Sequence, residues 1–231
     1  MTPHSRRPLT GLGALSLAAG LVDATSYLGL GHVFTANMTG NVVFLAFALA
    51  GTAGFSVTSS LLALVGFLVG AVSGGRFLPR RPTAGRARVA FGAQAGILAV
   101  VVVLSALASR HPEHTARYLL VFLLGAAMGL QNAAVRRLAI PETSTTVLTS
   151  TLVSLATESF LARGDNAHAG RRVSTVVMLF TGAAIGALLE SRRLTWSVLL
   201  ATIAVVCGGA VATMDHREAE HIIDDDGADP K

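Results

Sequence analysis

The chain has 231 residues, of which 52% are hydrophobic and only 13% are charged, with a net charge of +5. Soluble domains usually carry about 25% charged residues, so this composition excludes an ordinary soluble domain and indicates a membrane protein. The cations are almost all arginines in short gaps between apolar runs, without a basic face, which excludes a nucleic-acid-binding protein. A single cysteine, Cys207, excludes an internal disulfide framework.

Apolar segments long enough to cross a bilayer, which takes about 20 residues, follow one another along the chain. The expected segments lie at about 9–30, 34–53, 57–78, 89–109, 116–135, 145–162, 173–190 and 194–214. We therefore expect one transmembrane domain, residues 9–214, after a cytoplasmic N-terminus at residues 1–8. An arginine-rich loop precedes residue 89, and residues 215–231 form an acidic tail expected to be disordered. The first apolar run continues past Ala19 to Leu30, so we expect no cleaved signal peptide.

The second apolar segment differs from its neighbours because its first half is polar. Thr35, Asn37, Thr39 and Asn41 lie there, and Gly40 loosens the helix. Polar groups at membrane depth cost free energy unless protein groups or water satisfy them, so they tend to mark a working site.

The two halves of the chain, about 9–109 and about 116–214, resemble each other, which indicates an internal repeat. Residues 20–24 match 129–133, residues 35–46 match 145–156, and residues 66–76 match 182–192. This alignment pairs Asp23 with Asn132, Thr35 with Thr145, Thr39 with Thr149, Gly66 with Gly182, and Gly70 with Gly186. Chance similarity between low-complexity apolar segments is the alternative explanation.

The positions of the cations predict the topology, because cytoplasmic loops are enriched in arginine and lysine. Eight crossings would divide the cations equally between the two sides. If the polar stretch and its counterpart near residues 145–156 each enter and leave on one side, 14 cations lie on one side of the membrane and 4 on the other. We therefore predict an all-α polytopic membrane protein with six full transmembrane helices, two broken or re-entrant segments, an inverted repeat and cytoplasmic termini. A parallel repeat with eight spans is the alternative.

We predict a substrate site between the two broken segments. Asp23 lies well inside an apolar segment, where a charge costs several kcal/mol, so it either binds a proton or cation or clamps the polar stretch. Gln131 and Asn132 align with Asp23 and are expected in the same polar centre. The substrate-binding candidates are Asp23, Asn37, Thr39, Asn41, Gln131, Asn132, Thr145 and Thr149.

Sequence signatures of common enzymes, such as HExxH, G-x-S-x-G and the Walker glycine loop, are missing. We therefore expect no enzyme, no metal and no cofactor. Glycine rows at Gly66, Gly70 and Gly74 and at Gly182 and Gly186 permit close helix packing, within the chain or between subunits of a homo-oligomer.

One motif carries a resemblance to a known family. It reads Asp23-Ala-x-Ser26-Tyr27, followed by Phe34-Thr-Ala-Asn37-Met-Thr39-Gly40-Asn41, and it recurs more weakly in the second half. Over about residues 10–212 the chain resembles the YoaK-like family of bacterial inner-membrane proteins, although Ser150 stands where these proteins commonly have glycine. The resemblance implies a multi-pass protein of the bacterial inner membrane and no established activity.

These observations favour a small-solute transporter or permease in which one repeat rocks against the other, with Asp23 as the candidate for proton coupling. A non-transporting membrane scaffold or sensor subunit is the main alternative. A membrane-embedded enzyme acting on lipid or quinone is the third hypothesis. The expected partners are the lipid bilayer and an unidentified small molecule.

Overall fold

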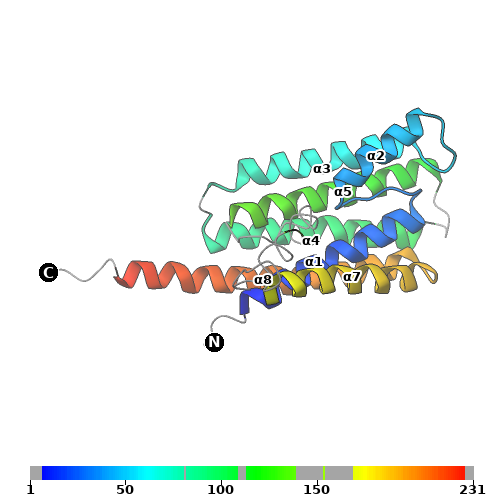
Figure 1. The fold of residues 1–231 in the computed structure, drawn as a ribbon. Coiled ribbons are helices and arrows are strands. Elements are labelled where there is room, and N and C mark those ends of the chain that lie inside the picture. Colours follow the sequence, from blue (N-terminus) through cyan, green and yellow to red (C-terminus); the bar gives the residue numbers. More distant parts are fainter. Residues whose placement is uncertain (1–6, 81, 109–112, 139–152, 154–168, 227–231) are drawn as a thin grey trace.

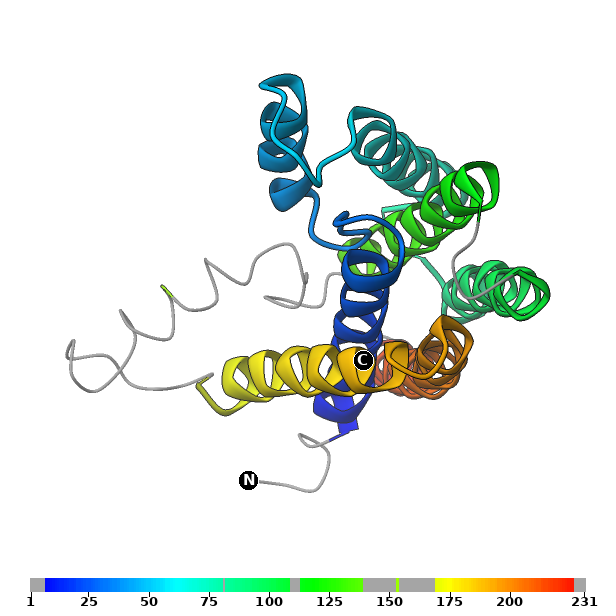
Figure 2. The same cartoon turned by 90° about the vertical axis from the view of Figure 1, so that its right-hand side faces the viewer.

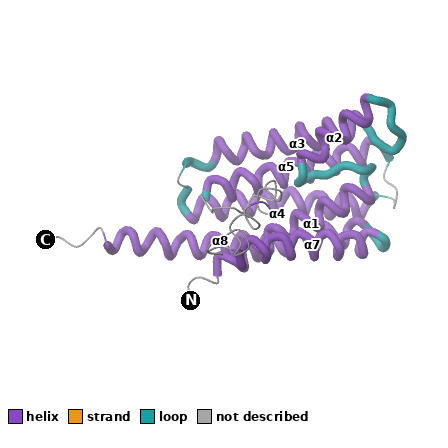
Figure 3. Tube along the Cα trace, viewed as in Figure 1, coloured by secondary structure: helices purple, strands orange, loops and turns teal. Residues whose placement is uncertain are grey.

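The computed structural model describes residues 7–80, 82–108, 113–138, 153 and 169–226, and the regular structure in these residues is helical (Figure 3). The helices are α1 (Arg7–Gly29), α2 (Met38–Leu49), α3 (Val57–Phe77), α4 (Ala84–Leu107), α5 (His114–Arg137), α7 (Ala169–Glu190) and α8 (Leu194–Asp226). All except α2 contain a stretch long and apolar enough to cross a membrane, which gives six candidate spans. Thr145 and Thr149, in the predicted second broken segment, lie outside the described residues.

The boundaries that differ most from the predicted ones are the start of α4 and the end of α8. Helix α4 begins at Ala84, five residues before the expected position, because Thr83 caps it by accepting a hydrogen bond from the Arg86 N–H at 3.4 Å. Helix α8 continues to Asp226, so the first part of the tail expected to be disordered is helical. The sequence contains neither glycine nor proline between Gly209 and Gly227, so no residue in that stretch breaks the helix.

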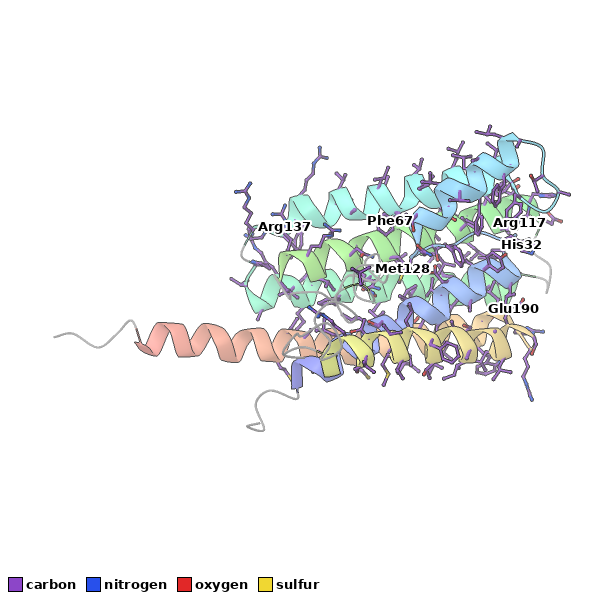
Figure 4. The ribbon with its side chains drawn as sticks, in the orientation of Figure 1. His32, Phe67, Arg117, Met128, Arg137 and Glu190 are labelled. Atoms are coloured by element: carbon purple, nitrogen blue, oxygen red, sulfur yellow. The ribbon has the colours of Figure 1, made fainter. Side chains whose placement is uncertain are left out.

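The six long helices lie side by side in a bundle with two distinct ends (Figure 1). Helices α1, α4 and α7 begin at one end, where α3, α5 and α8 also finish. Arg137 lies near this end, which we call the arginine-rich end, whereas Arg117, His32 and Glu190 lie near the opposite end (Figure 4). The alternating direction of the helices is the one expected for six crossings.

Glycine permits the closest helix contacts. A Cβ atom at Gly70 of α3 would overlap the carbonyl oxygen of Ala126 in α5, and one at Gly129 would overlap the carbonyl oxygen of Phe67. Helix α1 packs on α7 in the same manner. The predicted glycine rows therefore pack helices together within the chain.

Helix α1 lies in the middle of the molecule when it is viewed from the opposite end (Figure 2). It contacts both α7 and α8, while α4 packs on α8 and α5. The buried core between these helices includes Leu21, Leu98, Leu124 and Met128. Large apolar side chains such as Phe180 are exposed on the outer faces, where a lipid bilayer provides their environment.

Candidate functional site

Residues 30–56, which we call the arm, leave the bundle and rejoin it at the same end. Helix α1 finishes and α3 begins at the end opposite the arginine-rich end (Figure 1). An extended stretch first runs inward, and α2 then returns outward beside α3. Helix α2 stands apart from the six long helices in the end-on view (Figure 2).

Sharp turns redirect the chain on both sides of the arm. At the end of α1, the N–H of His32 donates to the carbonyl of Tyr27 at 3.0 Å, and Gly31 and His32 adopt φ values of 94° and 55°. After α2, Gly51 and Gly54 have φ values of 80° and 87°. Glycine takes up such left-handed conformations without steric cost, so three of these positions suit their residue type.

The carboxylate of Asp23 binds the main chain at the innermost part of the arm. Its Oδ1 accepts hydrogen bonds from the N–H groups of Thr35 at 2.8 Å and Ala36 at 2.7 Å. Asp23 lies six residues before the end of α1. At 1.5 Å per helical residue, it holds the arm about 9 Å from that end, measured along the axis of α1. These contacts match the clamp that was one of the two interpretations of Asp23.

Asn41 joins the inward and outward limbs of the arm to each other. Its Oδ1 accepts from the N–H of Phe34 at 2.9 Å, and its Nδ2 donates to the carbonyl of the same residue. The Asn41 side chain is fully buried. A single amide therefore satisfies two main-chain groups that would otherwise lack partners in an apolar environment.

Two candidate side chains remain exposed at the start of α2. Asn37 precedes this helix without capping it through its side chain, and the Thr39 hydroxyl donates to Asn37 Oδ1 at 2.8 Å. The N-terminus of a helix carries a partial positive charge. Asn37, Thr39 and the end of α2 therefore present polar groups that are open to a ligand.

Aromatic rings of α1 and the arm pack together. Tyr27 of α1 stacks on Phe34 with a centroid distance of 5.1 Å, and Phe34 stacks on Phe44 at 5.4 Å. Phe44 in turn contacts Phe55 at 5.1 Å. These contacts connect the end of α1 with both limbs of the arm.

A second polar cluster lies deeper in the bundle. Gln94 of α4 donates to Gln131 Oε1 at 2.6 Å, and Gln131 Nε2 donates to the carbonyl of Leu15 at 3.2 Å. Both glutamine side chains are buried. Sequence reasoning missed Gln94, although a single glutamine in the aliphatic segment 89–109 was a usable signal.

The expectation that Gln131 and Asn132 share one polar centre with Asp23 is wrong. Gln131 contacts Leu15, which is eight residues from Asp23 and hence about 12 Å away along α1. The Asn132 amide donates to the Met128 carbonyl at 2.9 Å within α5. Helices α1 and α5 run in opposite directions, so positions that align in sequence lie toward opposite ends of the bundle (Figure 1).

We expect Gln131→Leu to destabilise the protein by about 1–3 kcal/mol, because the buried Gln94 amide loses its partner. The double variant Gln94→Leu/Gln131→Leu should recover part of this loss, since two apolar side chains leave no buried polar group unpaired. Thermal unfolding in detergent measures both effects. If the double variant loses as much stability as the two single variants together, the two glutamines are not coupled.

Comparison with known proteins places this architecture among transmembrane proteins of unknown function. The family model described as "Protein of unknown function (DUF1275)" matches residues 12–212. The chain is 40% identical over 149 residues to the UPF0700 transmembrane protein YoaK of Bacillus subtilis (strain 168), a match that covers 62% of this chain and 64% of that protein. No solved structure matches the chain. The resemblance predicted from the Asp23 motif is confirmed.

Proposed function

This chain belongs to the family described as "Protein of unknown function (DUF1275)", and we propose that it is a small-solute transporter or permease of the bacterial inner membrane. The observation that carries the proposal is the N-terminus of α2, which lies inward from the end of α1 along the bundle axis with Asn37 and Thr39 exposed beside it. In many transporters, the ends of broken helices bind the substrate in this way.

The contacts divide the predicted site residues into two roles. Asn37 and Thr39 are free to contact a solute directly, whereas Asp23 and Asn41 hold the main chain that carries them. Thr145 and Thr149 remain the predicted contribution of the second half. Gln131 and Asn132 would act, if the solute passes that far, at the separate polar level near Leu15.

The pattern of helix packing supports an inverted internal repeat. If α1 is exchanged with α5, α3 with α7 and α4 with α8, the α3–α5 pair becomes the α7–α1 pair and the α1–α8 pair becomes the α5–α4 pair. The α4–α8 pair maps onto itself. A repeat of this kind supplies two similar halves that can rock against each other around a fixed site.

Glycine contacts support the same repeat with a different register. Gly20 lies against the carbonyl of Leu179 as Gly129 lies against that of Phe67, which requires an offset of 112 between α3 and α7. The sequence alignment used 116 and paired Gly70 with Gly186, one helical turn away from its counterpart Gly182. Glycines repeat every four residues in both helices, so two alignments of α3 with α7 that differ by one helical turn have almost equal sequence similarity.

The arm also supports a re-entrant segment, with the arginine-rich end in the cytoplasm. An arm that enters and leaves at one end keeps α1 and α3 antiparallel, as the division of 14 cations against 4 requires. Both termini are then cytoplasmic. Asn37 and Thr39, the exposed residues at the start of α2, are then reached from the opposite, external side.

Uptake by proteoliposomes tests the transport proposal. The probes are radiolabelled amino acids, sugars and organic acids, offered singly to liposomes with and without the protein. We expect Asn37→Ala and Thr39→Val to lower uptake of an accepted compound by about tenfold, the scale of losing one direct hydrogen bond to a ligand. Thr58→Val, which alters another exposed threonine at the same end, should leave uptake unchanged. Uptake unaffected by the Asn37 and Thr39 variants would refute the proposed site.

A non-transporting scaffold or sensor subunit is the second candidate function. Its support is that Asp23, Asn41 and Gln131 are all bonded to groups of the protein itself. On this hypothesis, no compound enters the proteoliposomes, and Asn37→Ala leaves every property of the protein intact.

A further inference from the structure

Helix α2 is packed less tightly than most of the long helices, whereas the inward limb of the arm buries Leu30, Val33, Thr35 and Ala36. Helix α2 packs mainly on α3, and only Met38 and Asn41 of its twelve residues are buried. By contrast, more than half of the α5 residues are buried. Apolar side chains of α2 such as Val42 and Leu49 face outward, where lipid solvates them as well as protein does.

Residues with left-handed backbone geometry bracket the arm. In the described chain, positive φ values occur at Gly31, His32, Gly51 and Gly54, and all four lie in this segment. At Gly51 and Gly54, no atom lies within 4 Å of the position that a Cβ would occupy. At Gly31, by contrast, an added Cβ would lie 3.5 Å from the Arg117 guanidinium. Glycine turns thus flank the intervening chain at both ends, and the turn after α2 is open.

The two buried polar side chains hold different things together. Asn41 bonds to Phe34, and both residues belong to the arm, so these bonds keep the arm in one piece. Asp23 belongs to α1, and its bonds to Thr35 and Ala36 attach the arm to the bundle. Other contacts of the arm at this point are the stack of Tyr27 on Phe34, a tilted contact of Tyr27 with Phe44 at 5.9 Å, and a long contact of 3.4 Å between the Thr35 and Ser26 hydroxyls. Val33 and Ala36 are also buried in the apolar core.

We propose that Asp23 is a latch, and that the arm swings away from α1 as a unit about Gly31 and Gly51 when its carboxylate releases the main chain. Hydrogen bonds to a carboxylate are about twice as strong as neutral ones, so loss of the charge weakens the attachment most. The swing would carry the start of α2, with Asn37 and Thr39, away from α1 and so change how these residues are reached from the external end. A gate has a role only in a chain that moves a solute, so this inference rests on the proposed transport function.

Spin-label distances test the latch without any substrate. In a Cys207→Ser background, labels at Leu49 of α2 and Leu107 of α4, which are 71% and 81% exposed, report the position of the arm. A second pair, Leu107 and Leu188, spans two long helices and serves as the reference. Pulsed electron paramagnetic resonance in nanodiscs gives both distance distributions.

We expect Asp23→Ala to lengthen or broaden the Leu49–Leu107 distribution by about 5 Å, the scale of a one-turn displacement, and to leave the reference pair unchanged. Asp23→Asn, which retains an acceptor without the charge, should give a smaller shift. The matched control is Thr25→Val, because Thr25 lies two residues away on α1 but bonds to Ser197 of α8. It should not move the arm.

The outcomes separate the latch from transport. An unchanged Leu49–Leu107 distribution in both Asp23 variants overturns the latch, whatever the uptake assay gives. If Asp23→Ala also disturbs the reference pair, the Leu49–Leu107 distribution of Asp23→Asn is compared with that of Thr25→Val instead. Equal distributions in these two variants overturn the latch. A shifted arm supports the latch, and uptake unaffected by Asp23→Ala then overturns its role as a gate.

Discussion

We expect Gly129→Val to prevent the chain from folding stably and Gly92→Val to leave its stability close to that of the parent. A Cβ at Gly129 would overlap the carbonyl oxygen of Phe67, and no change of rotamer can move a main-chain atom aside. Overpacking of this kind costs about 3 kcal/mol or more. At Gly92, no atom lies within 4 Å of the place that a Cβ would take, so the larger side chain meets lipid instead of protein.

Thermal unfolding in detergent, together with the yield of monodisperse protein, measures this difference. Gly20→Val should behave like Gly129→Val, because Gly20 lies against the carbonyl of Leu179 in the α1–α7 pair. Equal melting temperatures for Gly129→Val and Gly92→Val would contradict the packing of α3 on α5.

We expect Asn41→Leu to free the arm locally and to destabilise the protein by about 2–4 kcal/mol, because the N–H and the carbonyl of Phe34 both lose their partner. Leucine has a similar size, so the loss reflects hydrogen bonding and not a cavity. Hydrogen exchange followed by mass spectrometry should show faster exchange within residues 34–41 and little change in α5.

Asn37→Leu is the matched control for this prediction, since Asn37 is exposed and its side chain does not cap α2. Its exchange pattern should stay close to that of the parent. If Asn41→Leu and Asn37→Leu exchange alike, the bonds to Phe34 do not hold the arm together.

The long helices could be predicted from the sequence because a lipid environment leaves the backbone few choices. A run of about 20 apolar residues has to satisfy its main-chain groups internally, and the expected segments 57–78 and 194–214 begin at the same residues as α3 and α8. That the arm enters and leaves the membrane on one side stays a prediction, which the polar residues within an apolar run and the division of cations favour.

The partners within the candidate site could not be predicted in the same way. Asp23 binds main-chain N–H groups, which every residue except proline possesses, so no side-chain pattern identifies them. The pairing of Gln94 with Gln131 depends on how α4 crosses α5, and the two residues are 37 positions apart. Gln131 was placed beside Asp23 by alignment, which carries no information about the opposite directions of α1 and α5.

The pairing of α3 with α5 and of α1 with α7 has a consequence for biosynthesis. A ribosome completes α1 to α4 before α5 exists, yet the tightest glycine contacts of α1 and α3 are made with helices from the second half of the chain. During membrane insertion, these glycine faces therefore stay unpaired until late in translation. The first half expressed by itself would lack its strongest helix partners and depend on the second half to complete assembly.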